Sequence, residues 1–339
     1  GADVSRRRAL TMPSLPEPTA QYNIFTGQVH AKYDLDLFGA ARFANASLAA
    51  QVEQQAFQLE SARRSLAGNI VAGALASAAL AERVALTEKQ VVLARQVARD
   101  TQRRYELGAA SQNDALDADQ DAATLAASLP GLRAQWHATR HALAVLLGRS
   151  PDQAPPDLAF GMLAVPEQVP VVVPSELLAA RPDILFADAV VQAAAADVGV
   201  ATAQMFPSLS LSASMGKGGF NWPAALSGAG SIWAIGASLT QPIFHGGAML
   251  AERSAAKERY EAALLQYKQT VLTAFRDVAD TLSRLDADGQ ALASAEASRR
   301  AAEQSYRNTA SRVRLGALAP YTEHAAEQHY VAARLREIE

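Results

Sequence analysis

Two long stretches of the chain, 39–108 and 247–316, carry a helical pattern of residues. Each is bounded by glycines 69 positions apart (108 − 39 and 316 − 247), and the stretches are offset by 208. The second is rich in Ala, Leu, Glu, Arg and Gln, which are good helix formers, and Gly289 is its only interior glycine. A helix of this length would reach roughly 100 Å, which is too long for an ordinary globular core. The pattern therefore predicts an elongated unit built twice, with an internal two-fold sequence repeat.

Within the first stretch, apolar residues recur at intervals of seven. They form two runs, Val52, Leu59 and Leu66, and then Val84, Val91, Ala98 and Tyr105. A seven-residue repeat indicates helices that pack side by side with a slight supercoil, and the many alanines between these positions allow close approach.

Both stretches end in the same way, with RRYELGAAS at 103–111 and SRVRLGALA at 311–319. Gly108 suits a helix C-cap, and Ser111 or Asn113 suits the N-cap of a return helix. We expect this return helix to extend to about Leu147, interrupted or kinked by Pro130. The stretches thus predict antiparallel helical hairpins.

Alternation of apolar and polar residues predicts strands elsewhere in the chain. It occurs over 22–37, over 208–215 and over 233–240, the last two separated by a turn containing Gly, Ser and Trp. The last two lie within 198–251, where Lys217 is the only charged residue. Strands of about ten residues have the length that crosses a bilayer as tilted β structure.

Strands in a membrane raise a problem of closure. Four strands leave two open edges, which hydrocarbon does not tolerate, and barrels of a single chain begin at about eight strands. Several copies of the chain would have to complete one barrel, and the same symmetry would gather the long helices into a tube.

The other segments give weaker signals. The opening, with Arg6 to Arg8 and three prolines by Pro18, is expected to be loose. A Pro-rich linker, 148–174, contains a strand-like run at 171–173, and a helix is expected near Ser175 that restarts at Pro182 and reaches about Gln204. In the repeat, residue 1 matches position 209 and residue 339 matches position 131, so the chain is expected to be a fragment.

Composition excludes several functions. A formal charge of −3 gives no support for nucleic acid as a partner, and a chain without cysteine has no thiolate chemistry. The uncharged run 65–81 is a poor membrane helix because it contains Gly68, Asn69 and Gly73. His137 and His141 have the spacing of a metal pair but lack a third ligand nearby, and packing explains them better. No cofactor, metal site or enzymatic activity is expected.

Four motifs in order resemble one family. They are YDLDLFG at 33–39, RHALAVLLGRSP at 140–151, PSELLAARPDI at 174–184 and LTQPIFHGG at 239–247. Together they resemble the outer membrane factor (TolC-like) family of tripartite efflux systems, in its NodT/OprM-type lipoprotein branch. The resemblance implies a homotrimer in the outer membrane, with four strands per protomer in one β-barrel and a long periplasmic α-helical barrel. It also implies a periplasmic adaptor protein and an inner-membrane RND pump as partners. Members of this branch usually carry a lipidated N-terminal cysteine; the sequence contains no cysteine, so this anchor is expected to lie in a missing N-terminus or to be absent.

The fold predicted is therefore mainly α with a small β part. Its segments are barrel strands at 1–38, a helical arm and return helix at 39–148, a linker at 149–182, a helix at 183–206, a barrel hairpin at 207–244, and a second arm with a partial return helix at 245–339. The function implied is a passive export duct for small molecules. The alternatives are a type I secretion duct for proteins and, from another class, a soluble coiled-coil scaffold.

The family places its periplasmic gate and adaptor-docking site at the helical turns. The corresponding residues here are Arg103, Arg104, Tyr105, Gly108, Asp114, Asp117, Arg312, Arg314, Gly316, Tyr321 and Glu323. Solvated charges at helix ends are the simpler explanation for some of them. The aspartate that the family commonly has near Ala325 or Ala326 is missing. Trp222 and Trp233 are expected at the membrane interface, where amphipathic rings collect.

Overall fold

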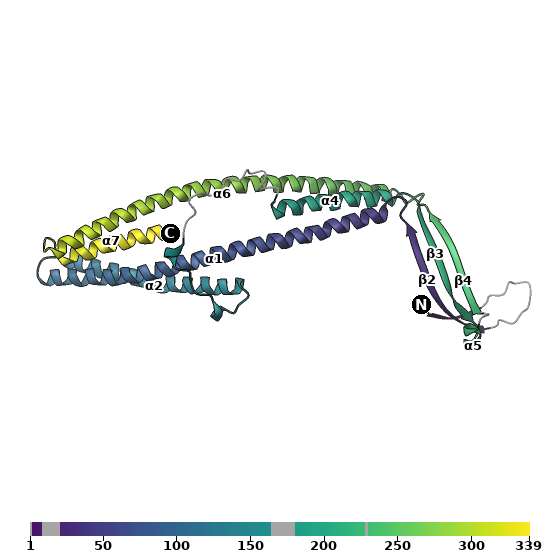
Figure 1. The fold of residues 1–339 in the computed structure, drawn as a ribbon, viewed down its shortest axis with the longest axis horizontal. Coiled ribbons are helices and arrows are strands. Elements are labelled where there is room, and N and C mark those ends of the chain that lie inside the picture. Colours follow the sequence, from purple (N-terminus) through teal and green to yellow (C-terminus); the bar gives the residue numbers. More distant parts are fainter. Residues whose placement is uncertain (1, 9–20, 164–179, 228–229) are drawn as a thin grey trace, which may run out of the picture. The chain divides into compact units, whose positions relative to one another are not determined.

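The computed structural model describes residues 2–8, 21–163, 180–227 and 230–339, and it is mainly helical with a small sheet, as predicted (Figure 1). The longer helices are α1 (Ala40–Glu106), α2 (Gln112–Leu146), α4 (Pro182–Ala203), α6 (Ala248–Arg314) and α7 (Pro320–Ile338). Shorter elements are α5 (Trp222–Leu226) and the 3₁₀ turns η1 (Pro151–Gln153) and η2 (Phe160–Met162). The strands are β1 (Ala2–Arg8), β2 (Gln21–Leu35), β3 (Ser208–Gly219) and β4 (Ser231–Thr240).

The chain divides into two compact units. The strand unit comprises residues 1–58 and 180–271, and the tip unit comprises residues 59–179 and 272–339. Helices α1 and α6 each contribute residues to both units.

The two long helices α1 and α6 each contain 67 residues. Glycines with positive φ stand at their ends: Gly39 (+86°) and Gly247 (+84°) precede them, and Gly108 (+72°) and Gly316 (+73°) follow them. Glycine adopts these angles without the steric cost that a Cβ would impose, so these residues set the helix limits.

Helix α2 begins as expected but is not interrupted. Ser111 is its N-cap, and a capping box joins Ser111 to Asp114. Of the two effects predicted for Pro130, the interruption was wrong, because α2 is one helix with this proline inside it, and a kink stays a prediction.

The sheet has the order β1-β2-β3-β4, with each neighbouring pair antiparallel. Strand β2 ends at Leu35, two residues before the expected end, because the side chain of Asp36 caps the N-terminus of helix α1. Its carboxylate accepts hydrogen bonds from the backbone N–H groups of Ala41 (3.1 Å) and Arg42 (3.0 Å). A carboxylate in this position satisfies donors that the first turn of α1 leaves open.

Three further expectations need comment. The opening was expected to be loose, but residues 2–8 form β1, whose backbone pairs with the edge of β2. The hairpin turn between β3 and β4 contains the helix α5, which the alternation of residues does not reveal. The strand-like run 171–173 and the helix start near Ser175 lie outside the described residues.

In the strand unit, α4 packs closely on the first part of α1. The side-chain amide of Gln54 donates to the carbonyl of Ala189 (3.3 Å), and Gly199 lies so close to the Phe43 ring that a Cβ there would come within 2.6 Å of it. By length and composition alone, α1 and α4 each contain a stretch apolar enough to cross a membrane, 33% of it buried. Packing against α1 covers alanines of α4 with protein, so their apolar character does not require lipid.

In the tip unit, α7 is bound to both long helices. An apolar cluster joins Leu86 and Leu93 of α1 to Val331 of α7, which is 1% exposed. On the other side, the rings of Tyr306 (α6) and Tyr330 (α7) stack with centroids 6.0 Å apart. Helix α2 packs on α1 through small residues, Ala94 and Ala98 against Ala122.

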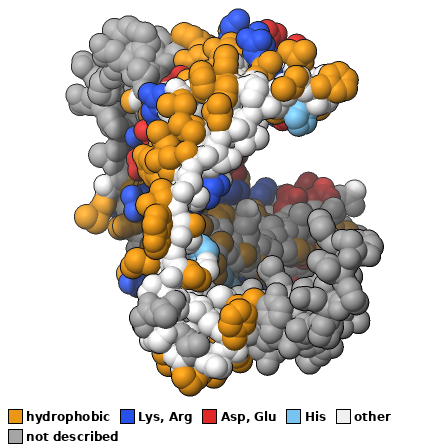
Figure 2. All heavy atoms as spheres, turned by 90° about the vertical axis from the view of Figure 1, so that its right-hand side faces the viewer, with side chains coloured by type: hydrophobic (Ala, Val, Ile, Leu, Met, Phe, Trp, Pro, Cys, Tyr) orange, Lys and Arg blue, Asp and Glu red, His pale blue; other side chains and the backbone are white. Residues whose placement is uncertain are grey.

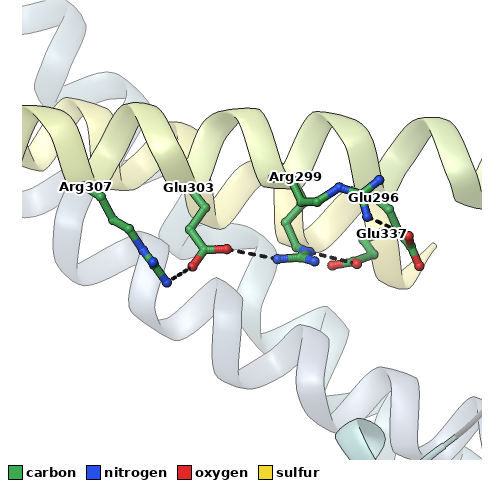
Figure 3. A network of polar contacts seen from close by, with 6 residues as sticks. Glu296, Arg299, Glu303, Arg307 and Glu337 are labelled. Carbon is green, nitrogen blue, oxygen red and sulfur yellow. Dashed lines mark hydrogen bonds and ion pairs between the residues drawn. The ribbon is translucent and has the colours of Figure 1, made fainter.

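Ion pairs reinforce the contact between α6 and α7 (Figure 3). Arg299 of α6 binds Glu337 of α7 (2.8 Å) and Glu303 of its own helix (3.0 Å), and Glu303 also binds Arg307. The carboxylate of Glu337 raises the pKa of Arg299. The network keeps α7 in register along α6.

A polar cluster attaches the segment after α2 to the helices of the tip unit. The carboxylate of Asp157 accepts a hydrogen bond from the hydroxyl of Ser77 (α1) and one from Nε1 of Trp136 (α2, 3.2 Å), and it lies 3.7 Å from Nε of Arg140. Arg140 also donates to the carbonyl of Pro155 (3.4 Å). One carboxylate therefore binds two helices to the segment that contains η1 and η2.

The two apolar heptad runs differ in their surroundings. In the second run, Val84, Val91 and Ala98 are buried by their own chain, as a packed helix predicts, whereas Tyr105 at its end is 39% exposed. The first run, by contrast, is exposed: Val52 (70%), Leu59 (52%) and Leu66 (44%).

Candidate membrane sheet and helical tip

One face of the sheet is a continuous apolar surface. The register places Val29, Met215 and Trp233 opposite one another on β2, β3 and β4, and these side chains are 74–76% exposed. The same face carries Tyr33 and Leu211, and at its end the row Leu35, Leu209 and Leu239. Figure 2 shows hydrophobic side chains gathered along the strands.

The opposite face of the same strands is polar. His30, Lys32 and Asp34 of β2 pair with Ser214, Ser212 and Ser210 of β3. Lys32 and Asp34 form an exposed ion pair (3.1 Å). Because side chains of a strand alternate between faces, this arrangement gives the sheet one apolar and one water-compatible side.

The apolar face has little cover from its own chain. Helix α5 contacts β2 and β3 at one end of the sheet. A soluble antiparallel sheet normally packs its apolar face on a core. A contiguous exposed apolar patch of this kind marks a surface for a membrane or a protein partner.

The two tryptophans predicted at a membrane interface both lie at the hairpin end of the sheet. Trp233 is on the apolar face and is 75% exposed, and Trp222 is 59% exposed. The ring of Trp222 packs on that of Phe25, with centroids 5.1 Å apart. Both rings are therefore accessible, but their place in a bilayer stays a prediction.

The two helical turns of the tip unit have the same backbone geometry. In the first, the N–H of Gly108 donates to the carbonyl of Tyr105 and that of Ala109 to Arg104; in the second, Gly316 donates to Val313 and Ala317 to Arg312. This double hydrogen bond around a glycine with positive φ is the Schellman motif. The second turn lacks a side-chain N-cap, but Pro320 begins its return helix.

Side-chain contacts bring the two turns together. The guanidinium of Arg104 (α1) lies over the ring of Tyr321 (α7), 4.5 Å from its centroid. One turn away, Nδ1 of His324 lies 3.0 Å from the carboxylate of Asp100. Further along, Lys89 of α1 binds Glu327 of α7 (2.6 Å). These contacts form a seam between the hairpin α1–α2 and the hairpin α6–α7.

Only part of this seam was predicted from the sequence. Arg104, Tyr321 and His324 were predicted to lie at the tip, whereas Asp100 and its contact with His324 were missed. The spacing of Asp100 and Arg104, four apart on α1, places both on one helix face but does not identify the partner of either residue. Of the other predicted residues, most are exposed and one, Glu323, is half-buried; the exposed ones are Arg103, Tyr105, Asp117, Arg312 and Arg314.

Asp114 has its contacts inside its own hairpin. Its carboxylate accepts a hydrogen bond from the N–H of Ser111 (2.9 Å), and its own N–H donates to the Ser111 hydroxyl (3.1 Å). These bonds to Ser111, with a smaller contribution from the charge of Arg104, hold the pKa of Asp114 below its ordinary value.

The lowered pKa predicts how the first turn responds to acid. A depressed pKa stabilises the folded turn above the ordinary pKa of Asp, about 4, and this stabilisation is lost as the pH falls through the lowered value. We expect amide exchange in 109–116, corrected for its intrinsic pH dependence, to become faster at about pH 3 than at about pH 7. In Asp114→Asn the corrected rate should be equal at both, and an equal pH effect in this variant would contradict the assignment.

The histidine pair remains without a metal-site geometry. The rings of His137 and His141 lie 6.4 Å apart on α2, and Trp136 packs on His137. In the described parts of the chain, no three His, Asp or Glu side chains gather as metal ligands.

Comparison with known proteins identifies the family. The model of the outer membrane efflux protein family matches residues 6–149 and 173–339. The chain is 29% identical over 289 residues to the pyoverdine export outer membrane protein OpmQ of Pseudomonas putida, covering 84% of this chain and 61% of that protein. It is 31% identical over 282 residues to the outer membrane protein OprJ of Pseudomonas aeruginosa, covering 80% of this chain and 56% of that protein.

Solved structures share the fold. The outer-membrane channel OprN is 28% identical in sequence, and its structure superimposes with a TM-score of 0.86. The matched region covers 100% of this chain and 76% of that one. The outer membrane protein VceC of Vibrio cholerae is 24% identical, with a TM-score of 0.81 over 100% of this chain and 82% of that one.

The chain belongs to the outer membrane efflux protein family. This confirms the resemblance inferred from the motifs and places the protein in the outer membrane. The chain spans 61% of the length of OpmQ from P. putida and 55% of the length of OpmQ from P. aeruginosa.

Proposed function

We propose that the chain is a subunit of a passive export duct, the outer membrane channel of a tripartite efflux pump. The observation that carries this proposal is the two-faced sheet, whose apolar side is exposed along its length while its other side is polar. Lipid suits the first side and a water-filled lumen suits the second. A soluble coiled-coil scaffold has no use for such a sheet.

Closure of the barrel requires further copies of the chain. The sheet has four strands, with β1 and β4 at its edges, and unpaired edges are costly in hydrocarbon. Three copies of a four-stranded sheet supply twelve strands, enough for a barrel with a lumen. The homotrimer is therefore our proposal for the assembled state.

The helices support the same assembly. Val52, Leu59 and Leu66 repeat at heptad spacing and are exposed in the single chain, so a neighbouring copy is their proposed partner. The arms 39–148 and 245–339 would then line a periplasmic tube below the barrel strands at 1–38 and 207–244.

In this proposal the tip is the gate and the docking site for a periplasmic adaptor. The seam of Arg104 with Tyr321 and Asp100 with His324 holds the two hairpins together and keeps the entrance narrow. Asp114 shapes the first turn through its cap. The duct performs no chemistry of its own, and the energy for export comes from an inner-membrane RND pump. Relatives are named for pyoverdine and toluene export, and small molecules are the proposed cargo here.

The gate is tested by opening the seam. The double variant Asp100→Asn/Arg104→Gln loses one cation–π contact and one charged hydrogen bond, each worth about 1 kcal/mol. Together they shift the balance of closed and open entrances by roughly 30-fold per protomer. We expect higher single-channel conductance in planar bilayers and greater sensitivity of cells to large antibiotics.

A matched control removes the same charges elsewhere. Arg99 contacts Gln96 on its own helix, and Asp119 is exposed on α2. The variant Arg99→Gln/Asp119→Asn should conduct as the unmodified channel does. If the unmodified protein, the seam variant and the control variant conduct equally, the seam has no role in the gate. If none of them forms a channel, the proposed duct is wrong.

A further inference from the structure

Helix α5 lies on the apolar face of the sheet. Phe25 is four residues from Val29 and Lys217 is two residues from Met215, so the alternation of side chains places both on this face. The ring of Trp222 packs on Phe25, and Ala225, in the last turn of α5, is 4% exposed. The short helix therefore folds back along the side of the strands that carries Val29, Met215 and Trp233.

Lys217 holds α5 in this place. Its ammonium donates a hydrogen bond to the carbonyl of Leu226, the last residue of α5, over 2.8 Å. A lysine near a helix C-terminus satisfies an open carbonyl and interacts favourably with the helix dipole. It is also the only Asp, Glu, Lys or Arg in 198–251. The one charged side chain of this segment therefore orients α5.

The outer side of α5 is aromatic and apolar. Phe220 (68%), Trp222 (59%) and Leu226 (67%) are exposed around it. This surface continues the exposed apolar face of the sheet at the end where β3 and β4 are joined. At the opposite end, β2 and β4 lead into the first turns of α1 and α6, so α5 lies at the end of the sheet away from the start of both helices.

We propose that α5 is an interfacial anchor that rests in the outer leaflet of the outer membrane, with its rings at the level of the lipid headgroups. The inference rests on the proposed barrel, whose lipid-facing side is the face that α5 covers. Amphipathic rings are favoured at the boundary of headgroups and acyl chains, and lysine stems suit the same depth. The anchor fixes the height of the barrel in the membrane and keeps the hairpin turn away from the lumen.

Tryptophan fluorescence of the full chain in lipid vesicles tests this directly. The chain has three tryptophans, so pairs of Trp→Phe substitutions leave Trp136, Trp222 or Trp233 alone. The vesicles contain phospholipids brominated at defined depths, and iodide is the aqueous quencher. We expect shallow bromines to quench Trp222 and lipid also to quench Trp233, whereas bromines at any depth should leave Trp136 unquenched.

The three proteins separate the failure of the anchor from that of the barrel. If lipid quenches Trp233 while Trp222 responds to iodide alone, the anchor is wrong and the barrel stands. If Trp222 responds to neither quencher, it is covered by a neighbouring copy, and the anchor is also wrong. If lipid quenches neither Trp233 nor Trp222, the proposed duct itself fails.

The role of Lys217 has its own measurement. Lys217→Met keeps the length of the side chain and removes the donor to Leu226. In the protein with Trp222 alone, this change should shift the emission to longer wavelength and increase quenching by iodide, while Trp233 in its own single-tryptophan protein is unaffected. An unchanged Trp222 spectrum would overturn the role of the lysine, and Lys217→Arg should restore the original spectrum.

Discussion

Cells that produce the Ile235→Arg variant are expected to contain little assembled channel in the outer membrane. Ile235 is in the middle of β4, stands opposite Ala213 on the apolar face and is 78% exposed. An arginine on the lipid side of a barrel costs about 2–4 kcal/mol near the bilayer midplane. In a symmetric assembly every copy bears this cost, so insertion should fail rather than weaken slightly.

The matched control is the neighbouring residue. Ala234 faces the polar side of the same strand, opposite Ser214, so Ala234→Arg places the same charge in the lumen. This variant should assemble normally. The measurement is the amount of oligomer in the outer membrane fraction, relative to total protein in the cell. If both variants assemble as well as the unmodified chain, neither face of the sheet contacts lipid.

The second large effect is expected at Asp157 in the tip unit. Asp157→Ala removes the acceptor of the Ser77 hydroxyl and the Trp136 indole, and Ser77 is 1% exposed. It also leaves Arg140 without its carboxylate partner. Buried donors without acceptors destabilise by roughly 2–3 kcal/mol in total, so the thermal unfolding midpoint should fall by roughly 5–10 °C.

Two further substitutions make this test specific. Asp152, five residues earlier, is exposed, and Asp152→Ala should change stability by no more than about 0.5 kcal/mol. Asp157→Asn keeps one oxygen acceptor and should fall between the two. The result that contradicts the role of Asp157 is a melting curve of Asp157→Ala that coincides with that of Asp152→Ala.

Local features of the fold could be predicted because they depend on residues close in sequence. The glycines at 39, 108, 247 and 316 mark the helix limits since only glycine adopts their φ angles cheaply. The alternation in β2, β3 and β4 identified the strands and their apolar face. Ser111 was one of two predicted caps, with Asn113, because a polar side chain before a helix satisfies its free N–H groups.

Features that depend on distant residues were missed. Nothing near Asp100 indicates that His324, 224 positions away, will lie against it. The same holds for Asp157, whose partner Ser77 is 80 positions earlier. Helix α5 escaped because five residues are too few to show a helical period, and its contacts with Phe25 and Lys217 define its place.

The sequence by itself determined the elements of this protein: two helices of equal length, turns at fixed glycines, and strands with one apolar side. It could do so because backbone angles and the alternation of side chains are set by near neighbours. Only the tertiary structure decided which hairpins share a seam, which carboxylate binds the linker and on which face α5 lies. Those choices are made by packing and hydrogen bonds between residues that the chain itself keeps far apart.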